Sequence, residues 1–196
     1  MYAETLLDIA MRHSNALIEK AQKGDETAFN KLVQLWYKRM YNFALKYFSD
    51  HDLAMDATQK TFISMHRNIN KLQDSDKFRP WLYRIMTNFC REEHRRSQGQ
   101  RFTSDLTLVK QTSEGPETSY RKKELTELLF DAMEVIPADQ RVIVIMKEYE
   151  GMKFKEIAEV LDISENTAKS RLYYGLSALK KVLSEMNITK ENYYGI

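Results

Sequence analysis

The sequence contains few of the residues that interrupt or cross-link a chain: one cysteine, three prolines and six glycines among 196 residues. A single cysteine cannot form a disulfide within the chain, which excludes a disulfide framework and suits a reducing compartment. Few prolines and glycines favour long helices over many short strands. Hydrophobic residues make up 43% and charged residues 30% of the chain, so we expect a packed core beneath a charged surface.

Long apolar segments are absent as well. No stretch approaches the roughly 20 apolar residues that a membrane span requires. Glu4 and Asp8 interrupt the apolar start of the chain, which argues against a signal peptide. We therefore expect a soluble, cytoplasmic protein that is not inserted in a membrane.

The usual signatures of catalytic and metal sites are also missing. The histidines, His13, His51, His66 and His94, have no metal-ligand spacing with one another or with Cys90, so we expect no metal site. The sequence has no glycine-rich phosphate loop and no nucleophile motif. We predict no cofactor and no enzymatic activity, and we expect Cys90 to be a small packing residue.

A polar segment divides the chain into two helical parts. Residues 97–119 are rich in Ser, Thr, Gln and Gly and lack helical periodicity, which is typical of a linker. Helical periodicity predicts helices over residues 25–48, 51–69 and 78–96 before it, and over residues 120–136, 137–151, 154–163 and 164–186 after it. We predict an all-α protein of two small helical domains joined by a flexible linker. The expected units are an N-terminal extension (1–15), a first domain (16–96), the linker (97–119), a second domain (120–187) and a C-terminal tail (188–196).

The excess positive charge lies in the first domain. Residues 1–96 carry 16 Lys and Arg against 12 Asp and Glu, whereas residues 121–196 carry 12 against 13. In the predicted helix FRPWLYRIMTNFCREEHRR, two faces separate: an apolar one with Leu82, Ile85, Met86 and Phe89, and a basic one with Arg84, Asn88, Arg91 and Arg95.

Guanidinium groups at this spacing can hold phosphates, and an asparagine can contact base edges. The alternative is a solvated arginine face that Glu92 and Glu93 balance. We expect Trp81 in the core, as is commoner for an aromatic at this spacing than a base-stacking role.

The stretch FKEIAEVLDISENTAKSRL in the second domain has the pattern of a helix-turn-helix. An apolar face (Phe154, Ile157, Ala158, Leu161) is followed by a short turn, by Ser164 as an N-cap, and by inward positions Ala168, Leu172, Gly175 and Leu179. In this motif the N-terminal residues of the second helix contact bases in the major groove. The candidates are Glu165, Asn166, Lys169, Ser170 and Tyr173, with Arg171 for a phosphate. An unrelated helical hairpin is the alternative.

Both patterns together resemble one family. AMDATQKTF (54–62) and FRPWLYRIMTNFCREEHRR (78–96) are similar to region two, and IPADQR (136–141) and GMKFKEIAEVLDISENTAKSRL (151–172) to region four, of extracytoplasmic-function (ECF) sigma factors. These are the small promoter-recognition subunits of bacterial RNA polymerase, in the sigma-70 family. The resemblance covers nearly all of residues 16–184.

The resemblance implies an alternative sigma factor, which directs core RNA polymerase to promoters and opens the minus-10 element. Asp56 and Gln59 would dock on the clamp coiled coil of the polymerase, while Phe62 beside them is expected in the core. Region four would read the minus-35 element through the candidates above and rest on the polymerase flap. An anti-sigma factor would be a further partner. For the minus-10 element, Asn88 and Arg91 would contact bases. Arg84, Arg95 and Arg96 would contact phosphates. The turn that contains Asn70 and Lys71 would also contact this element.

The chain departs from the family pattern at several positions. Glu92 replaces the usual Asp, Asp162 the usual Gly and Ala168 the usual Val, and Tyr174 and Leu176 stand where many relatives carry Arg. Because the last two changes remove phosphate-binding charge, we expect polymerase to hold region four on DNA. The alternative function is a stand-alone helix-turn-helix regulator that binds an operator, usually as a dimer.

Overall fold

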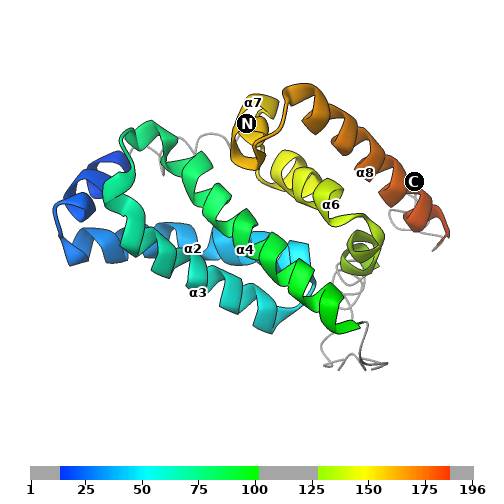
Figure 1. Cartoon of the computed structure of the whole chain (residues 1–196), viewed down its shortest axis with the longest axis horizontal. Helices are drawn as coiled ribbons and strands as arrows, with labels where there is room; N and C mark the ends of the chain where they lie inside the picture. The colour runs from blue at the N-terminus through cyan, green and yellow to red at the C-terminus, as the bar shows by residue number, and fades with distance from the viewer. Residues whose placement is uncertain (1–13, 102–127, 186–196) are drawn as a thin grey trace, which may run out of the picture.

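The computed structural model describes residues 14–101 and 128–185 of the chain. Within these ranges every regular element is a helix and no strand is present. None of the helices described there is both long enough and apolar enough to cross a bilayer. The expected N-terminal extension, most of the expected linker and the C-terminal tail lie outside the described residues. For the rest, the predicted all-α class is confirmed (Figure 1).

The first domain is a bundle of long helices. After a helical segment over residues 14–22 come α2 (Glu26–Phe48), α3 (His51–Asn68) and α4 (Phe78–Arg101), with short 3₁₀ turns η1 (Ile69–Lys71) and η2 (Ser75–Lys77) between α3 and α4. Asp25 caps α2, its carboxylate accepting from the Ala28 amide at 3.0 Å, and Asp50 caps α3 in the same way. These caps satisfy amide groups that a helix start leaves without partners.

The core of this bundle lies where α2, α3 and α4 meet. Leu32, Trp36, Met40 and Phe43 follow one face of α2 and are at most 2% exposed. The Trp36 ring meets Phe78, at the start of α4, edge-on with centroids 5.5 Å apart. This aromatic packing fixes where α4 begins relative to α2.

Helix α4 is buried on two sides, which differs from the single apolar face expected. Leu82 and Met86 are fully buried as predicted, but Tyr83, Thr87 and Cys90 are fully buried too. Tyr83 meets Phe43 of α2 edge-on with centroids 5.4 Å apart, and its hydroxyl reaches Glu150 of the second domain, so both domains contribute to its burial. Burial raises the pKa of the Cys90 thiol, which fits its expected role as a packing residue.

Helix α4 is also longer than expected, since residues 97–101 of the predicted linker are helical. Extending an existing helix is much easier than starting one, so polar residues can continue it. The predicted helix ended at residue 96 because the prediction depended on the spacing of apolar residues.

The second domain contains the predicted helix-turn-helix. A helical segment over residues 128–135 leads to α6 (Ala138–Val144), a π-helical turn η3 (Ile145–Tyr149), α7 (Phe154–Leu161) and α8 (Glu165–Glu185). Ile157, Leu161 and Ala168 are buried where α7 meets α8. The hydroxyl of Ser164 accepts from the Thr167 amide at 3.0 Å, which confirms it as the N-cap of α8.

The two domains pack against each other, with α7 and α6 beside α4 and α2 (Figure 1). Arg141 of α6 donates from Nη1 to the main-chain oxygen of Tyr47, at 2.6 Å, at the end of α2. Ser49, just beyond α2, donates to the main-chain oxygen of Phe130 at 3.3 Å. These contacts, between residues 94 and 81 positions apart in sequence, join the second domain to the end of α2, and α7 lies beside α4.

Candidate nucleic-acid interface

The N-terminal half of α8 presents most of the predicted minus-35 readers to solvent. Glu165, Asn166, Lys169, Ser170 and Tyr173 are all exposed, Tyr173 by 70% of its surface. The Ser164 cap and the buried Ala168 orient the helix so that these positions face solvent. A major groove can receive such a face.

Arg171, the candidate for a phosphate, is placed differently from the other candidates. It is partly buried, and its Nε pairs with the Asp139 carboxylate of α6 at 3.2 Å. Sequence periodicity on α8 alone could not reveal this partner because Asp139 belongs to another helix.

Aromatic side chains extend the outer face of α8. Tyr173 and Tyr174 meet edge-on with centroids 5.7 Å apart, and Tyr174 and Leu176 are 60% and 38% exposed. The Lys169 ammonium lies 5.8 Å from the centre of the Phe154 ring of α7, which restrains its long side chain. The outer surface of α8 is thus more aromatic and less basic than the family pattern.

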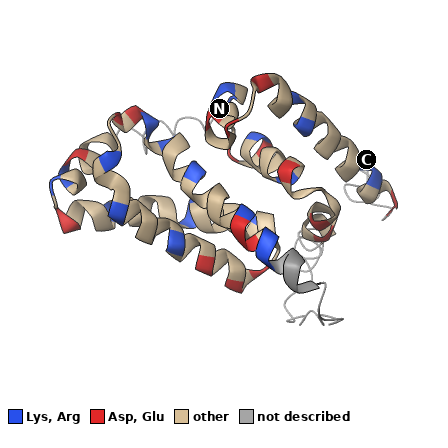
Figure 2. Cartoon of the chain, in the orientation of Figure 1, with Lys and Arg blue, Asp and Glu red and all other residues tan. Residues whose placement is uncertain are grey.

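The predicted minus-10 readers on α4 are mostly exposed. Arg84, Asn88, Arg95 and Arg96 are exposed and Arg91 is partly buried. Near the end of the helix, acidic residues stand among the basic ones (Figure 2), and Arg96 pairs with Glu93 at 3.4 Å. The Arg96 side chain is 65% exposed although Glu93 is only 15% exposed, so most of Arg96 remains open to solvent.

Arg84 has partners from the second domain. Its Nη2 donates to the main-chain oxygen of Glu159, and its Nε donates to that of Val160 at 3.4 Å. Both acceptors lie in the last turn of α7, where main-chain oxygens lack helical partners and carry partial negative charge.

The turn before α4 is held in place by a side chain from the N-terminal helical segment. The Gln22 amide donates to the main-chain oxygens of Ile69 and Leu72, at 2.9 and 2.7 Å. Asn70 and Lys71 remain exposed on this turn, and the Lys71 ammonium donates to Asn68 at 2.8 Å.

A small cavity of about 150 Å³ lies between this turn, the start of α4 and the side chain of Glu159. Trp81 lines it and is only partly buried, although it packs against the core as expected. Its other lining residues are Leu72, Lys77, Pro80, Arg84 and Glu159.

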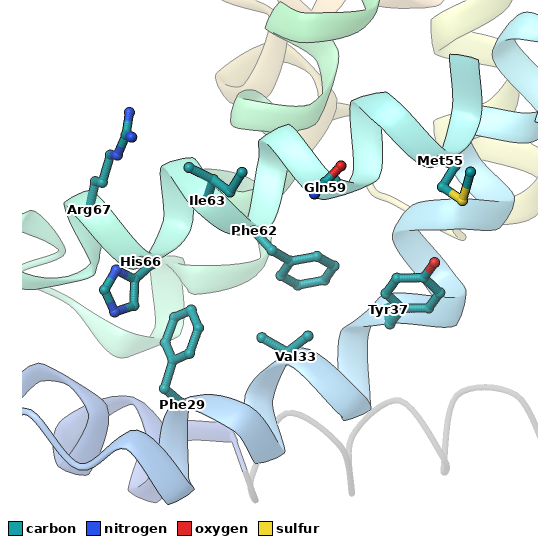
Figure 3. Close-up of a pocket in the computed structure, with 9 residues that line it drawn as sticks. All are labelled: Phe29, Val33, Tyr37, Met55, Gln59, Phe62, Ile63, His66 and Arg67. Atoms are coloured by element: carbon teal, nitrogen blue, oxygen red, sulfur yellow. The ribbon is translucent and has the colours of Figure 1, made fainter. Parts of the chain in front are cut away.

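A larger groove of about 810 Å³ runs between α2 and α3 (Figure 3). The Phe62 ring points from α3 toward Val33 of α2, and Phe29 meets His66 edge-on with centroids 4.9 Å apart. Phe62 is 8% exposed, consistent with its expected core position. The groove is lined by Phe29, Val33, Tyr37, Met55, Gln59, Phe62, Ile63, His66 and Arg67.

Of the two predicted polymerase contacts, Gln59 lines this groove and Asp56 does not. Asp56 pairs with Lys60, one turn later on α3, at 2.5 Å. Sequence reasoning missed the apolar walls, because Phe29 and Val33 fit the helical period of a core face equally well.

A buried charged cluster joins the two domains, and no sequence pattern pointed to it. The carboxylate of Glu150, 5% exposed, accepts from Arg39 Nε at 2.7 Å and from the Tyr83 hydroxyl. Arg79 Nη2 donates to the main-chain oxygen of Glu150 at 2.5 Å. Burial, followed by the neighbouring Glu150, raises the pKa of Tyr83 well above its ordinary value.

No group of three or more His, Cys, Asp or Glu residues in the described ranges is placed to hold a metal ion. The described residues instead form three surfaces that could contact another molecule. They are the exposed face of α8, the basic face of α4 and the apolar groove between α2 and α3.

Two family models match the chain. The model described as Sigma-70 region 2 matches residues 32–100, and that described as Sigma-70, region 4 matches residues 126–179. Together they cover more than half of the sequence. Their order and separation agree with the two domains seen in the structure.

Curated relatives match over most of their length. The ECF RNA polymerase sigma-E factor of Haemophilus influenzae is 29% identical over 169 residues, which cover 81% of this chain and 88% of the relative. The protein of the same name from Escherichia coli K12 is 28% identical over 174 residues, covering 83% and 90%.

Solved structures share the fold. CnrH, in complex with the cytosolic domain of CnrY, aligns with a TM-score of 0.68 at 21% identity, covering 88% of this chain and 98% of that one. The sigma factor RpoE, in complex with the anti-sigma factor NepR from Bartonella quintana, aligns with a TM-score of 0.66 at 22% identity, covering 80% and 96%.

Proposed function

Because the chain belongs to the sigma-70 family, we propose that it is an alternative sigma factor of the ECF type, which directs core RNA polymerase to a specific set of promoters. In this role it recognises the minus-35 and minus-10 elements and opens the latter. Its work is binding and DNA deformation, without covalent chemistry of its own. It acts in the cytoplasm, together with polymerase and promoter DNA.

The observation that carries this proposal is that one chain holds a helix-turn-helix with an exposed reading face and a basic helix of the matched region two. In the second domain, Glu165, Asn166, Lys169, Ser170 and Tyr173 are proposed to contact minus-35 bases, and their exposure supports this. Arg171 is proposed to contact a phosphate, for which it would exchange its pairing with Asp139.

The minus-10 element is proposed to bind along α4 and the turn before it. Asn88 and Arg91 would contact bases, while the phosphate contacts would come from Arg84, Arg95 and Arg96 and from Asn70 and Lys71 on the turn. Separating DNA strands costs a few kcal/mol, which is offset when unstacked bases and the single strand are bound. The half-open cavity beside Trp81 supports this placement, since an aromatic wall can stack on a base.

The domain division is proposed to match these roles. Residues 16–96 would bind polymerase and the minus-10 element, and residues 120–187 the minus-35 element and the polymerase flap. The linker, 97–119, would hold the two readers at promoter spacing. Tethering raises the effective concentration of the second reader, so each half can be weak alone.

The groove between α2 and α3 is proposed to receive the clamp coiled coil of polymerase, with Gln59 inside it and Asp56 beside it. Three of its apolar residues are exposed although the chain has a well-packed core: Tyr37 by 45%, Met55 by 53% and Ile63 by 44%. Contiguous exposed apolar surface of this kind marks a protein-binding site. An amphipathic helix would cover these side chains.

Regulation by an anti-sigma factor is part of the proposal. Structures that share this fold were solved with partner proteins, the CnrY cytosolic domain and the anti-sigma factor NepR. A partner that covers the polymerase groove or either reading surface would keep the sigma factor from promoters.

The experiment that tests docking is a pull-down with core RNA polymerase from the source organism. Ile63→Asp places a charge in the apolar groove, and we expect it to weaken core binding by at least about tenfold. Leu35→Asp is the matched control, because Leu35 is similarly exposed on α2, at 46%, but does not line the groove. Failure of the unmodified chain to bind core polymerase would overturn the proposal.

A further inference from the structure

The first turn of α8 presents two neighbouring side chains with different hydrogen-bonding groups, Glu165 and Asn166. They are the first two residues of the helix, and both are exposed. The Ser164 hydroxyl, which accepts from the Thr167 amide, fixes where this turn begins. In a helix-turn-helix, positions at the start of the second helix meet the edges of base pairs in the major groove.

The Glu165 carboxylate has no cation partner in residues 14–101 and 128–185. Lys169 stands one turn later, at the spacing that favours an ion pair within a helix. Its ammonium lies instead 5.8 Å from the centre of the Phe154 ring of α7. Lys181 and Glu185 do pair at the same spacing near the end of α8. The Glu165 carboxylate is therefore available to accept hydrogen bonds from another molecule.

The next turn of α8 is less able to select bases. The Ser170 hydroxyl donates to the main-chain oxygen of Thr167 at 3.0 Å, which uses its only hydrogen. Lys169 is drawn toward Phe154, and Lys147 lies 4.9 Å from the centre of the same ring. Glu165 and Asn166 are thus the polar side chains of the reading face without a partner in the part of the chain that the structure describes.

A carboxylate against DNA restricts the bases that it can face. It accepts hydrogen bonds and donates none, and phosphates repel it. In the major groove guanine offers acceptors and thymine offers an acceptor and a methyl group, whereas cytosine offers its N4 amine and adenine its N6 amine. Adenine also presents the N7 acceptor beside that amine, which repels a carboxylate. Cytosine is therefore the base that suits Glu165.

The Asn166 amide suits a different base. Its nitrogen donates and its oxygen accepts, which matches N7 and N6 of adenine in a bidentate pair. Adjacent residues of a helix are 1.5 Å apart along its axis, and base pairs follow one another every 3.4 Å. The side chains of Glu165 and Asn166 therefore reach neighbouring base pairs.

We infer that Glu165 and Asn166 determine the sequence of the minus-35 element, which carries a C·G pair facing Glu165 beside an A·T pair facing Asn166. The inference rests on the proposed function and deepens it, because it assigns bases to a face that was proposed to read DNA. Glu165 acts by exclusion as well as by attraction. A guanine or thymine opposite it would leave the carboxylate against an acceptor, without a hydrogen bond.

The test uses the holoenzyme, which is the full chain with core RNA polymerase, on a promoter that it is first shown to transcribe. The minus-35 element of that promoter is randomised, and the DNA that binds is recovered and sequenced. We expect a C·G pair at one position and an A·T pair beside it, each enriched at least about fivefold over the alternatives.

Two variants assign these positions to the two residues. Glu165→Gln adds a donor and removes the charge, so the preference at the first position should move from cytosine to adenine by about fivefold. Asn166→Ala should flatten the preference at the neighbouring position. Glu185→Gln is the control, because it removes the same charge at the far end of α8, where Glu185 pairs with Lys181. Its sequence profile should equal that of the unmodified protein.

A purely structural role for Glu165 predicts a different result. An acidic residue in the first turn also stabilises a helix through the partial charge at its N-terminus. If Glu165 did only this, Glu165→Gln would weaken binding to every sequence equally, and the inference would be wrong. A guanine or thymine at the position that responds to Glu165→Gln would overturn it as well. Failure of the proposed function would show earlier, as the absence of any promoter-specific transcript.

Discussion

The Tyr83 hydroxyl donates a hydrogen bond to the Glu150 carboxylate, and this bond joins the helix proposed to read the minus-10 element to the start of the helix-turn-helix. Tyr83 is fully buried and Glu150 is 5% exposed. A buried acceptor that loses a donor bears the cost of its own desolvation. The bond therefore couples the packing of the two domains to the stability of each.

Removing this hydroxyl should destabilise the protein. Tyr83→Phe keeps the ring but leaves Glu150 with one donor fewer, so we expect the free energy of unfolding to fall by about 1–3 kcal/mol. Urea denaturation followed by circular dichroism would measure the change. Tyr37→Phe is the control, because Tyr37 is 45% exposed, and its effect should stay within about 0.5 kcal/mol. Equal effects of the two substitutions would contradict the role given to the Tyr83 hydroxyl.

The buried tyrosines should make the protein sensitive to alkaline pH. Burial raises the pKa of both Tyr83 and Tyr47 in the folded protein. Below pH about 10 both groups are protonated in the folded and unfolded states and add no pH dependence. Above that value the unfolded chain loses these protons while the folded chain keeps them, so the free energy of unfolding falls as pH rises.

Urea unfolding at several pH values between 8 and 11 would measure this fall, and Tyr83→Phe should show a smaller slope. The ultraviolet absorbance of phenolate should show two tyrosines that ionise only as the chain unfolds. Identical slopes for Tyr83→Phe and the unmodified protein would argue against a raised Tyr83 pKa.

The contact between α8 and α6 should tolerate no side chain at Gly175. A Cβ there would lie 2.9 Å from Val144 Cγ2 and 3.3 Å from Gln140 Cβ. Alanine ordinarily stabilises a helix by about 1 kcal/mol relative to glycine, but Val144 is buried and β-branched and cannot easily move.

We therefore expect Gly175→Ala to lower the free energy of unfolding by about 1–2 kcal/mol. Ser177→Ala, at an exposed position of the same helix, should raise the stability slightly. Thermal unfolding of both variants would measure the two changes. A stabilising Gly175→Ala would show that α8 does not pack this closely on α6.

Glycine, the usual family residue at position 162, should stabilise the turn between α7 and α8. Asp162 has φ of +55°, in the left-handed region that glycine adopts without strain. Asp162→Gly should raise the free energy of unfolding by up to about 1 kcal/mol, because glycine adopts this backbone conformation without strain. Little packing is lost, because the Asp162 side chain is exposed. Loss of stability in the same denaturation assay would mean that the Asp162 side chain contributes more than its backbone strain costs.

Much of the second domain could be predicted from the sequence because its signals are local. The Ser164 cap, the buried Ala168 and the spacing of Ile157 and Leu161 depend only on residues close in the chain. These positions fold as predicted. The Arg171 pairing with Asp139 could not be found this way, because the partner lies on another helix.

The first domain shows what periodicity misses. Arg84 was expected on a free basic face, yet it lies against α7, and Tyr83, which was not among the expected core residues of α4, is fully buried with its hydroxyl on Glu150. Both follow from packing between domains, which no local pattern encodes. The groove beside Gln59 could not be predicted because its apolar residues have the same helical spacing as core residues. Here a local pattern existed, but it did not distinguish the two cases.

The measurement that tests the account most directly is run-off transcription with core RNA polymerase on fragments of the source genome. Adding the full chain should produce transcripts from discrete promoters that core polymerase alone does not produce, and Ile63→Asp should abolish them while Leu35→Asp does not. The account would be contradicted if the chain yields no promoter-specific transcript, and instead forms a dimer that shifts a palindromic DNA site without polymerase.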